Sequence, residues 1–257
     1  VSRNWIADVA IVADAKLALQ QLIEALKSES DPKAIERKNR FEKLLRSKQE
    51  YEREVLEECR TSARPIKSKR VVKELNEVFG KDTILVNENG SQDLWSYYFP
   101  YYKVLDILGC VPPAEQTYMG FGVTGAIGAK LACPDKKVVC VTGDGAFQMY
   151  MEELATAVQY NAPVTWVVLN NYGLGWIRYD EKAYGGRYIA VDYEAQPDFA
   201  KIAEAYGCYG EKVEDPEKVK GALKRALKSN EEGVPAVLDI IVDTWDLPYT
   251  FKEYLYT

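Results

Sequence analysis

The feature that most constrains the fold is an alternation of helical and strand-like segments from residue 67 onward. Apolar residues recur at helical spacing over residues 71–79, 122–131, 151–160, 198–206 and 216–228. Between these lie short runs of Val, Ile and Leu at residues 83–89, 137–144, 164–171 and 236–243. Runs without alternating polar residues are typical of parallel strands that are buried on both faces. The sequence therefore predicts an α/β fold with a doubly wound parallel sheet, whose ligands bind beyond the carboxyl ends of the strands.

Two stretches of different character precede this domain. Residues 1–30 contain an apolar, strand-like run at 7–14 and then a helical pattern at 16–26. Residues 31–66 are dense in Lys, Arg and Glu and carry only a thin apolar stripe, which indicates a charged helical linker or docking segment. We therefore expect three parts, with the α/β domain occupying residues 67–257.

The composition excludes several functional classes. The chain is 47% hydrophobic and 28% charged, as expected for a soluble folded protein, and its net charge of −6 argues against nucleic acid as the main partner. No apolar run reaches the roughly 18–20 residues that span a bilayer, so no membrane association is expected. The five cysteines form no CxxC pair, a pattern that favours free thiols and a cytoplasmic location.

The chain contains no histidine. This absence excludes serine–histidine and cysteine–histidine nucleophilic catalysis and the common metal sites that use histidine. Any proton transfer must therefore use carboxylates, water or a cofactor.

Two polar motifs follow two successive predicted strands. Gly143-Asp144-Gly145-Ala146 comes after the first, and Asn170-Asn171-Tyr172-Gly173 follows about two dozen residues later. That spacing holds one helix and one strand, so both motifs should meet at the same edge of a parallel sheet. Carboxylate, carboxamide and carbonyl oxygens suit Mg²⁺ or Ca²⁺, and the glycines allow the main chain to approach a diphosphate. The alternative is a tight turn followed by an ordinary loop.

These motifs resemble the signature of thiamine-diphosphate enzymes, a GDG followed by NN. Residues 117–147, TYMGFGVTGAIGAKLACPDKKVVCVTGDGAF, are similar to the matching segment of the acetolactate synthase family. Residues 87–95, NENGSQDLW, are similar to that family's cofactor loop, and residues 197–219 fit its closing helices. The resemblance extends over roughly residues 68–245 and implies the diphosphate-binding domain of the thiamine-diphosphate-binding fold.

The resemblance implies a role for each matching residue. Asp144, the side chain of Asn171 and the carbonyl of Gly173 would bind Mg²⁺. The remaining residues that it places around thiamine diphosphate are Ser91, Gln92, Thr117, Met119, Gly143, Gly145, Ala146, Leu174 and Gly175. This chain departs from the pattern at two positions: family members often have Gly where it has Thr117, and His or Asn near Gln92.

Met119 would act as a wedge beneath the cofactor that forces its bent form, and the carbonyl of Thr117 would accept a hydrogen bond from the 4′-amino group. The alternative for Met119 is ordinary core packing, the usual fate of methionine. Tyr172 and Trp176 follow the metal loop and are candidates for the substrate pocket, with ordinary packing as the alternative. The aromatic cluster at residues 95–102 is expected to serve the core and a subunit interface.

One part of the family's site has no counterpart in this sequence. The glutamate that contacts the pyrimidine ring comes from a separate pyrimidine-binding domain, which the resemblance places on a partner chain. Glu88 and Glu152 are expected to be surface or diphosphate-side carboxylates instead. Residues 1–30 resemble the end of the family's central domain. The resemblance thus implies either one subunit of a hetero-oligomer, such as a dimer of heterodimers, or the C-terminal part of a longer chain.

The resemblance implies a thiamine-diphosphate- and Mg²⁺-dependent carboligase or decarboxylase of 2-oxo acids. Three alternatives stay open from the sequence. They are a lyase or decarboxylase of 2-hydroxyacyl-CoA or oxalyl-CoA, a β-like subunit of a 2-oxo-acid:ferredoxin oxidoreductase, and a non-catalytic structural subunit.

Overall fold

The computed structural model describes residues 5–27, 29, 33–113 and 116–248, with the side chains of Gln92 and Asp93 outside the description. The chain divides into two compact units, Val1–Tyr51 and Glu52–Thr257.

The first unit contains helix α1 (Ala15–Leu26) and the beginning of α2 (Ala34–Cys59). Asp14 caps α1, because its carboxylate accepts a hydrogen bond from the N–H of Leu17 at 3.0 Å. The strand-like run at residues 7–14 is irregular in the structure, and its prediction as a strand is wrong. A strand needs a neighbour for its ladder of hydrogen bonds, and the described part of this unit offers none.

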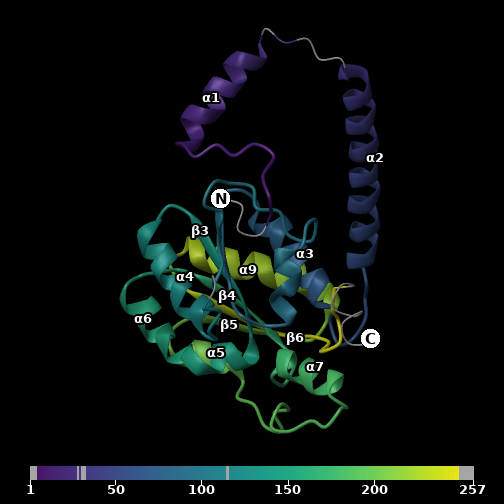
Figure 1. Cartoon of the computed structure of the whole chain (residues 1–257). Coiled ribbons are helices and arrows are strands. Elements are labelled where there is room, and N and C mark those ends of the chain that lie inside the picture. The colour runs from purple at the N-terminus through teal and green to yellow at the C-terminus, as the bar shows by residue number, and fades with distance from the viewer. Residues whose placement is uncertain (1–4, 28, 30–32, 114–115, 249–257) are drawn as a thin grey trace. The chain divides into compact units, whose positions relative to one another are not determined.

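The second unit is built on a six-stranded sheet in which each neighbouring pair is parallel. The strand order is β2-β1-β3-β4-β6-β5. The strands are β1 (Thr83–Asn87), β2 (Cys110–Val111), β3 (Lys137–Gly143), β4 (Thr165–Asn170), β5 (Tyr209–Val213) and β6 (Ala236–Ile241). Helices cover both faces, which confirms the predicted doubly wound α/β fold (Figure 1).

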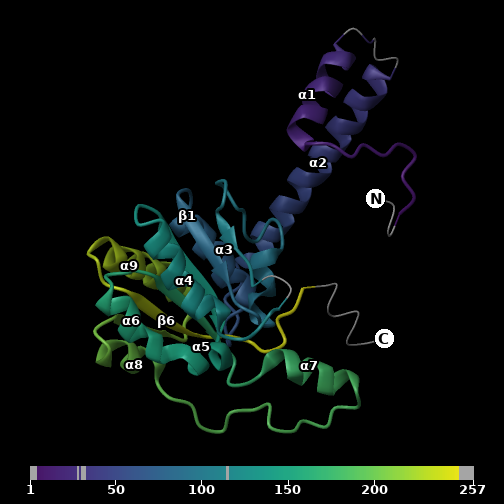
Figure 2. The ribbon, with the colours of Figure 1, turned by 60° about the vertical axis from the view of Figure 1, so that its left-hand side comes forward.

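Two hydrophobic cores lie on the two faces of this sheet. Helices α3 (Ser68–Phe79) and α9 (Val219–Glu231) pack on one face. The other face is covered by α4 (Phe121–Ala132), α5 (Asp144–Tyr150), α6 (Leu154–Gln159) and α8 (Phe199–Ala205), as Figure 2 shows from a second side. Successive side chains of β1 alternate between the cores: Leu85 belongs to the first, and Ile84 and Val86 to the second.

Several elements differ from the predicted ones. The helix expected over 151–160 begins with a 3-10 turn, η2 (Met151–Glu153), and that expected over 216–228 begins with η3 (Pro216–Lys218). The pattern did not reveal β2, β5, α7 (Gly175–Ala183) or the 3-10 helix η1 (Gln92–Tyr97). The reason is that β2 has two residues and β5 reads YGEKV, an edge strand with polar, half-exposed positions.

The aromatic cluster at 95–102 divides between core and surface. Trp95 and Tyr101 are buried and their rings meet edge to face, with centroids 4.6 Å apart. Tyr97 and Phe99 are exposed. The core part of the prediction is therefore confirmed, and the interface part stays a prediction.

The strand order fixes where a ligand crevice should lie. The chain leaves β1 toward β2 at one edge and leaves β3 toward β4 on the opposite side. The connections therefore diverge between β1 and β3, the topological switch point at which doubly wound sheets bind ligands.

All five cysteines are free thiols. The described part of the chain holds no helix long and apolar enough to cross a membrane.

Candidate functional site

A crevice lies at this switch point and is lined largely by glycine and backbone. We call it the glycine cradle; its cavity volume is about 100 Å³. Its lining residues are Asn89, Gly90, Ser91, Met119, Gly143, Asp144, Gly145, Ala146, Gly173, Leu174, Gly175, Trp176 and Ile177. Three loops contribute them, one after β1, one after β3 and one after β4, with Met119 preceding α4.

The register of the sheet brings these loops together. Gly143 at the end of β3 pairs with Leu169 of β4, so Asp144 and Asn170 leave the sheet side by side. Helix α5 begins at Asp144, and α7 begins at Gly175. Two helices therefore start at the cradle, and helix N-termini favour anions.

Asp144 is the central carboxylate of the cradle and is 1% exposed. Its Oδ2 accepts hydrogen bonds from the N–H of Gly173 at 3.0 Å and from Nε2 of Gln196 at 2.5 Å. Burial raises the pKa of Asp144 to about 6, although these neutral donors act in the opposite direction. The folded chain thus disfavours the negative charge at the position where a cation is predicted.

The second motif forms a tight loop beside Asp144. Nδ2 of Asn170 donates to Oδ1 of Asp239 at 2.8 Å, which anchors the end of β4 to β6. Tyr172 has a left-handed backbone with φ of 58°, and its N–H donates to Oδ1 of Asn170 at 3.1 Å. At Gly173 a Cβ atom would lie 2.2 Å from the carbonyl oxygen of Val191. Only glycine allows this loop to pass so close to residue 191.

Gly145 marks the floor of the cradle. A Cβ atom there would lie 2.8 Å from Cδ2 of Leu174, 3.0 Å from the hydroxyl of Tyr193 and 3.5 Å from Cε of Met119. The absence of a side chain at Gly145 therefore keeps open the space that these three side chains border. Met119 borders this space from the turn before α4.

Most of the predicted cofactor residues converge on this cradle. Those that line it are Ser91, Met119, Gly143, Asp144, Gly145, Ala146, Gly173, Leu174 and Gly175, and Trp176, predicted for the substrate pocket, lines it too. Asn171 follows the end of β4 and is buried, but it does not line the cradle, and neither do Thr117 and Tyr172. Gln92 starts η1, and its side chain lies outside the described residues.

Thr117 already has a partner for the carbonyl that was predicted to meet the cofactor. Nδ2 of Asn89 donates a hydrogen bond to it. A carbonyl oxygen has two lone pairs, so this contact leaves room for a second donor.

The sequence motifs missed several residues of the site. Asn89, Gly90 and Ile177 line the cradle, and the first two could have been found because they belong to the NENGSQDLW loop. Gln196 binds Asp144 from a segment with no sequence signal of its own. Glu88 is fully buried, so the surface position considered for it is wrong. Its carboxylate lies in the interior because it accepts hydrogen bonds from backbone N–H groups at the start of α4.

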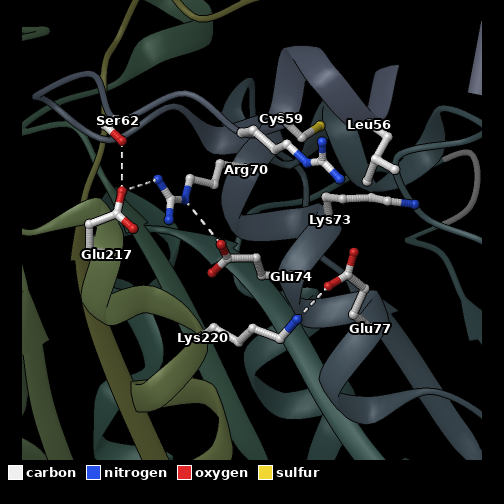
Figure 3. Close-up of a pocket in the computed structure, with 10 residues that line it drawn as sticks. Leu56, Cys59, Ser62, Arg70, Lys73, Glu74, Glu77, Glu217 and Lys220 are labelled. Carbon is white, nitrogen blue, oxygen red and sulfur yellow. Dashed lines mark hydrogen bonds and ion pairs between the residues drawn. The ribbon is translucent and has the colours of Figure 1, made fainter. Parts of the chain in front are cut away.

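A second cavity in the same unit is larger but different in kind. We call it the charged pocket; its volume is about 440 Å³ (Figure 3). Its lining residues are Leu56, Cys59, Arg60, Ser62, Arg70, Lys73, Glu74, Glu77, Glu217 and Lys220.

Arg70 is the centre of the charged pocket. Its guanidinium donates to Oε1 of Glu74 at 3.0 Å, to Oε1 of Glu217 at 2.9 Å and to the carbonyl of Thr61 at 2.7 Å. Lys220 pairs with Glu77 at 2.7 Å. The ion pairs join α3 to η3 and α9, and the hydrogen bond to Thr61 joins α3 to the segment after α2, so the pocket connects elements of the fold.

The chemistry of the glycine cradle fits a metal–diphosphate group. Among the described residues, no cluster of three His, Cys, Asp or Glu side chains could hold a metal. Mg²⁺ is commonly bound by one or two carboxylates together with phosphate oxygens and water, a set that Asp144 can begin. The open floor at Gly145 and the two helix starts suit the phosphates.

Comparison with protein families matches residues 88–240 to "Thiamine pyrophosphate enzyme, C-terminal TPP binding domain", thiamine pyrophosphate being a synonym of thiamine diphosphate. The chain belongs to this family. Among curated proteins it is similar to the probable acetolactate synthase large subunits of Methanococcus aeolicus, at 34% identity over 251 residues, and of Methanocaldococcus jannaschii, at 35% over 250. It is also 32% identical to the acetolactate synthase isozyme 3 large subunit of Escherichia coli.

These alignments cover 95% of this chain but only 40–42% of the relatives. This thiamine-diphosphate-family chain therefore spans less than half the length of the curated relatives it matches. A solved structure, the thiamine diphosphate-dependent 4-hydroxybenzoylformate decarboxylase of Rhodococcus jostii RHA1, matches with a TM-score of 0.64 and 28% identity. That match covers 72% of this chain and 34% of the decarboxylase. The acetolactate-synthase-like family assignment is thus confirmed.

Proposed function

We propose that this chain is the diphosphate-binding subunit of a thiamine-diphosphate- and Mg²⁺-dependent carboligase or decarboxylase that acts on 2-oxo acids. The observation that carries the proposal is the glycine cradle at the β1/β3 switch point, centred on the buried carboxylate of Asp144. The names of the relatives support it, since they include acetolactate synthases and a benzoylformate-type decarboxylase. The free thiols are in keeping with a cytoplasmic enzyme.

In this proposal the chain's own residues bind and orient. Asp144, the Asn171 carboxamide and the Gly173 carbonyl would hold Mg²⁺, and the backbone of Gly145 and Ala146 would bind the diphosphate. When bound, thiamine diphosphate supplies a thiazolium ring that serves as an electron sink for decarboxylation. Met119 and Leu174 border the space above Gly145 and would support the cofactor from this side. Trp176, which lines the cradle and is 40% exposed, would face the substrate; Tyr172 would stand at its margin.

We propose further that a second polypeptide completes the site. The described residues that line the cradle include one carboxylate, Asp144, and no glutamate that could face a pyrimidine ring. The rim also exposes apolar side chains, since Trp176 and Ile177 are 40% and 44% exposed. Exposed aromatic groups are enriched where proteins meet. A partner that carries a pyrimidine-binding domain would cover them in a hetero-oligomer, for example a dimer of heterodimers.

Reconstitution tests this proposal. The chain is mixed with a candidate pyrimidine-binding partner, Mg²⁺ and thiamine diphosphate, and CO₂ release is followed with a panel of 2-oxo acids. We expect turnover of at least about 1 per second only when both chains are present. Equal turnover by this chain alone would contradict the split site. Release of CO₂ from none of the 2-oxo acids, together with turnover of an acyl-CoA, would contradict the substrate class.

A further inference from the structure

Glu88 is a fully buried carboxylate that directly follows β1. Its Oε1 accepts hydrogen bonds from the N–H groups of Asn89 at 2.8 Å and Gly120 at 3.0 Å. Its Oε2 accepts from the N–H of Gly122 at 2.9 Å. Burial of a carboxylate is costly unless it is well hydrogen-bonded, and backbone donors meet that need here. One side chain therefore joins two segments that are about thirty residues apart in the sequence.

Both segments carry walls of the glycine cradle. Asn89 lines the cradle on one side, and Met119, which immediately precedes Gly120, lines it on another. Gly120 is the N-cap position of α4, and Gly122 belongs to the first turn of that helix. A carboxylate is favourable at such an end, where backbone N–H groups lack partners within the helix. Glu88 thus supplies the cap that Gly120, having no side chain, does not.

The glycines of this turn show how closely it is held. Gly120 has φ of 96°, and a Cβ atom there would lie 2.0 Å from the ring of Tyr150. A Cβ atom on Gly122 would lie 3.1 Å from Cα of Glu88 and 3.0 Å from Sγ of Cys140. Glycine therefore lets the turn approach Glu88, but it adds no side-chain packing of its own. Hydrogen bonds then hold the turn in position: those that Glu88 accepts from Gly120 and Gly122, and the one that Asn89 donates to the carbonyl of Thr117.

We propose that Glu88 is a positioning residue that fixes the Met119 turn against the loop after β1 and so sets the orientation of the Met119 side chain in the cradle. Glu88 does not line the cradle, so it acts through Gly120 and Asn89. The benefit to the cofactor rests on the proposed function, because it assumes that Met119 contacts the cofactor. The tether itself can be tested without any cofactor.

The test uses the methyl groups of methionine. The chain has three methionines, Met119, Met149 and Met151. In protein labelled with [methyl-¹³C]methionine, they give three NMR signals that single Met→Leu variants assign. In Glu88→Gln one carboxylate oxygen is replaced by an amide N–H₂ group, which donates and cannot accept. At least one backbone N–H group therefore loses its hydrogen bond. We expect the Met119 signal to move toward the position of a mobile methionine and to sharpen. The Met149 and Met151 signals should stay in place.

Glu153→Gln is the matched control, since it removes a carboxylate that accepts a hydrogen bond from Oγ1 of Thr156, at 2.6 Å, away from the cradle. All three signals should stay in place in this variant. An unchanged Met119 signal in folded Glu88→Gln would overturn the proposal, and so would an equal movement of all three signals. The second result would assign Glu88 a general structural role.

A measurement on the wild-type chain covers the case in which Glu88→Gln does not fold. The amide protons of Gly120 and Gly122 should exchange with solvent as slowly as those in the middle of α4. Exchange at the rate of an exposed loop would overturn the proposal.

Calorimetry with thiamine diphosphate and Mg²⁺ distinguishes failure of the proposed function from failure of the role of Glu88. If the wild type binds no cofactor, the proposed function fails while the methyl signals still decide the role of Glu88.

Discussion

The glycine cradle and the charged pocket lie in the same unit but give their acidic groups different partners: cations in the charged pocket, neutral hydrogen-bond donors in the cradle. In the charged pocket, hydrogen bonds and charge from Arg70, with help from Ser62, lower the pKa of Glu217 to about 2. Burial raises the pKa of Glu74 there, but Oε1 of Glu74 accepts from Arg70. In the cradle, burial raises the pKa of Asp144 to about 6, and Gln196 and the backbone offer only neutral donors.

This contrast separates the two cavities by the partners of their acids and not by their size. The charged pocket has about 440 Å³ and the cradle about 100 Å³. Arg70 and Lys220 already pair with acids of the same chain, so the larger cavity holds the fold together. The smaller one keeps a carboxylate whose charge the fold disfavours and a bound cation would stabilise. Strongly shifted acids in a crevice are typical of functional sites.

The largest effect is expected when the charged pocket loses its arginine. Arg70→Met should lower the free energy of unfolding by about 3–5 kcal/mol, because it leaves Glu74 buried without its cation. Urea denaturation followed by circular dichroism measures the change. Arg60→Met is the control, since Arg60 pairs with an exposed Glu57 and should cost less than about 1 kcal/mol. An equal loss in the free energy of unfolding for the two variants would contradict the claim that the pocket is structural.

The opposite sign is expected at Asp144. Its pKa rises from an ordinary 3.8 to about 6 on folding, so the folded chain binds the proton more tightly. The contribution of Asp144 to the free energy of unfolding is therefore fully present below about pH 4 and is lost as the pH rises through about 6. Asn carries no charge at any of these pH values, so Asp144→Asn does not lose stability in this way. Without metal, the variant should be more stable than wild type at pH 8 by roughly 1–3 kcal/mol. The difference should vanish near pH 4.

Urea titrations at the two pH values, with a chelator present, check this prediction. A variant that is less stable than wild type at pH 8 would show that the buried charge is already compensated within the chain. In that case the cradle and the charged pocket would not differ as described.

A third prediction concerns Gln196, whose side chain donates a hydrogen bond to Asp144 in the cradle. Gln196→Ala should weaken Mn²⁺ binding in the presence of thiamine diphosphate by about 10–100-fold, the usual cost of losing a hydrogen-bond partner of a metal ligand. Electron paramagnetic resonance of free Mn²⁺ measures the affinity. Gln148→Ala, on the exposed side of α5, is the control and should leave it unchanged. Equal affinities for the two variants would mean that Gln196 has no part in orienting Asp144.

The smallest effect on binding is expected at Met119. Met119→Ala should change the affinity for thiamine diphosphate by less than about threefold, because Asp144 and the backbone hold the other end. In the assembled enzyme the same variant should lower kcat at least about tenfold, since orientation serves the chemistry more than the binding. Met149→Ala, at an exposed position, is the control. A kcat within about twofold of wild type would assign Met119 to ordinary packing.

The sequence predicted the sheet well because its strands are buried on both faces. Continuous apolar runs such as the one in β3 have few other structures open to them, and strand ends then located Asp144 and Gly173. Edge strand β5, with the polar sequence YGEKV, carried no such pattern. The apolar run at 7–14 was wrongly predicted to be a strand. An apolar sequence alone cannot supply the neighbouring strand that pairing requires.

The support of the site was less predictable than its centre. Gln196 reaches Asp144 from a segment 52 residues away in the sequence, and Glu88 turned inward because backbone donors of a distant turn satisfy it. Contacts of this kind depend on tertiary geometry, which spacing along the chain does not encode. The charged pocket likewise joins α3 to η3, and the dense charges of the chain gave no indication of which would pair.

The central claim is that the glycine cradle, and not the larger charged pocket, binds thiamine diphosphate through Mg²⁺ and Asp144. Isothermal titration calorimetry of thiamine diphosphate into wild type, Asp144→Ala and Arg70→Met, with and without Mg²⁺, tests it directly. We expect one Mg²⁺-dependent site in the wild type and in the folded fraction of Arg70→Met. Asp144→Ala should lose at least about 100-fold in affinity while staying folded. Unchanged affinity in folded Asp144→Ala, or its loss in folded Arg70→Met, would contradict the claim.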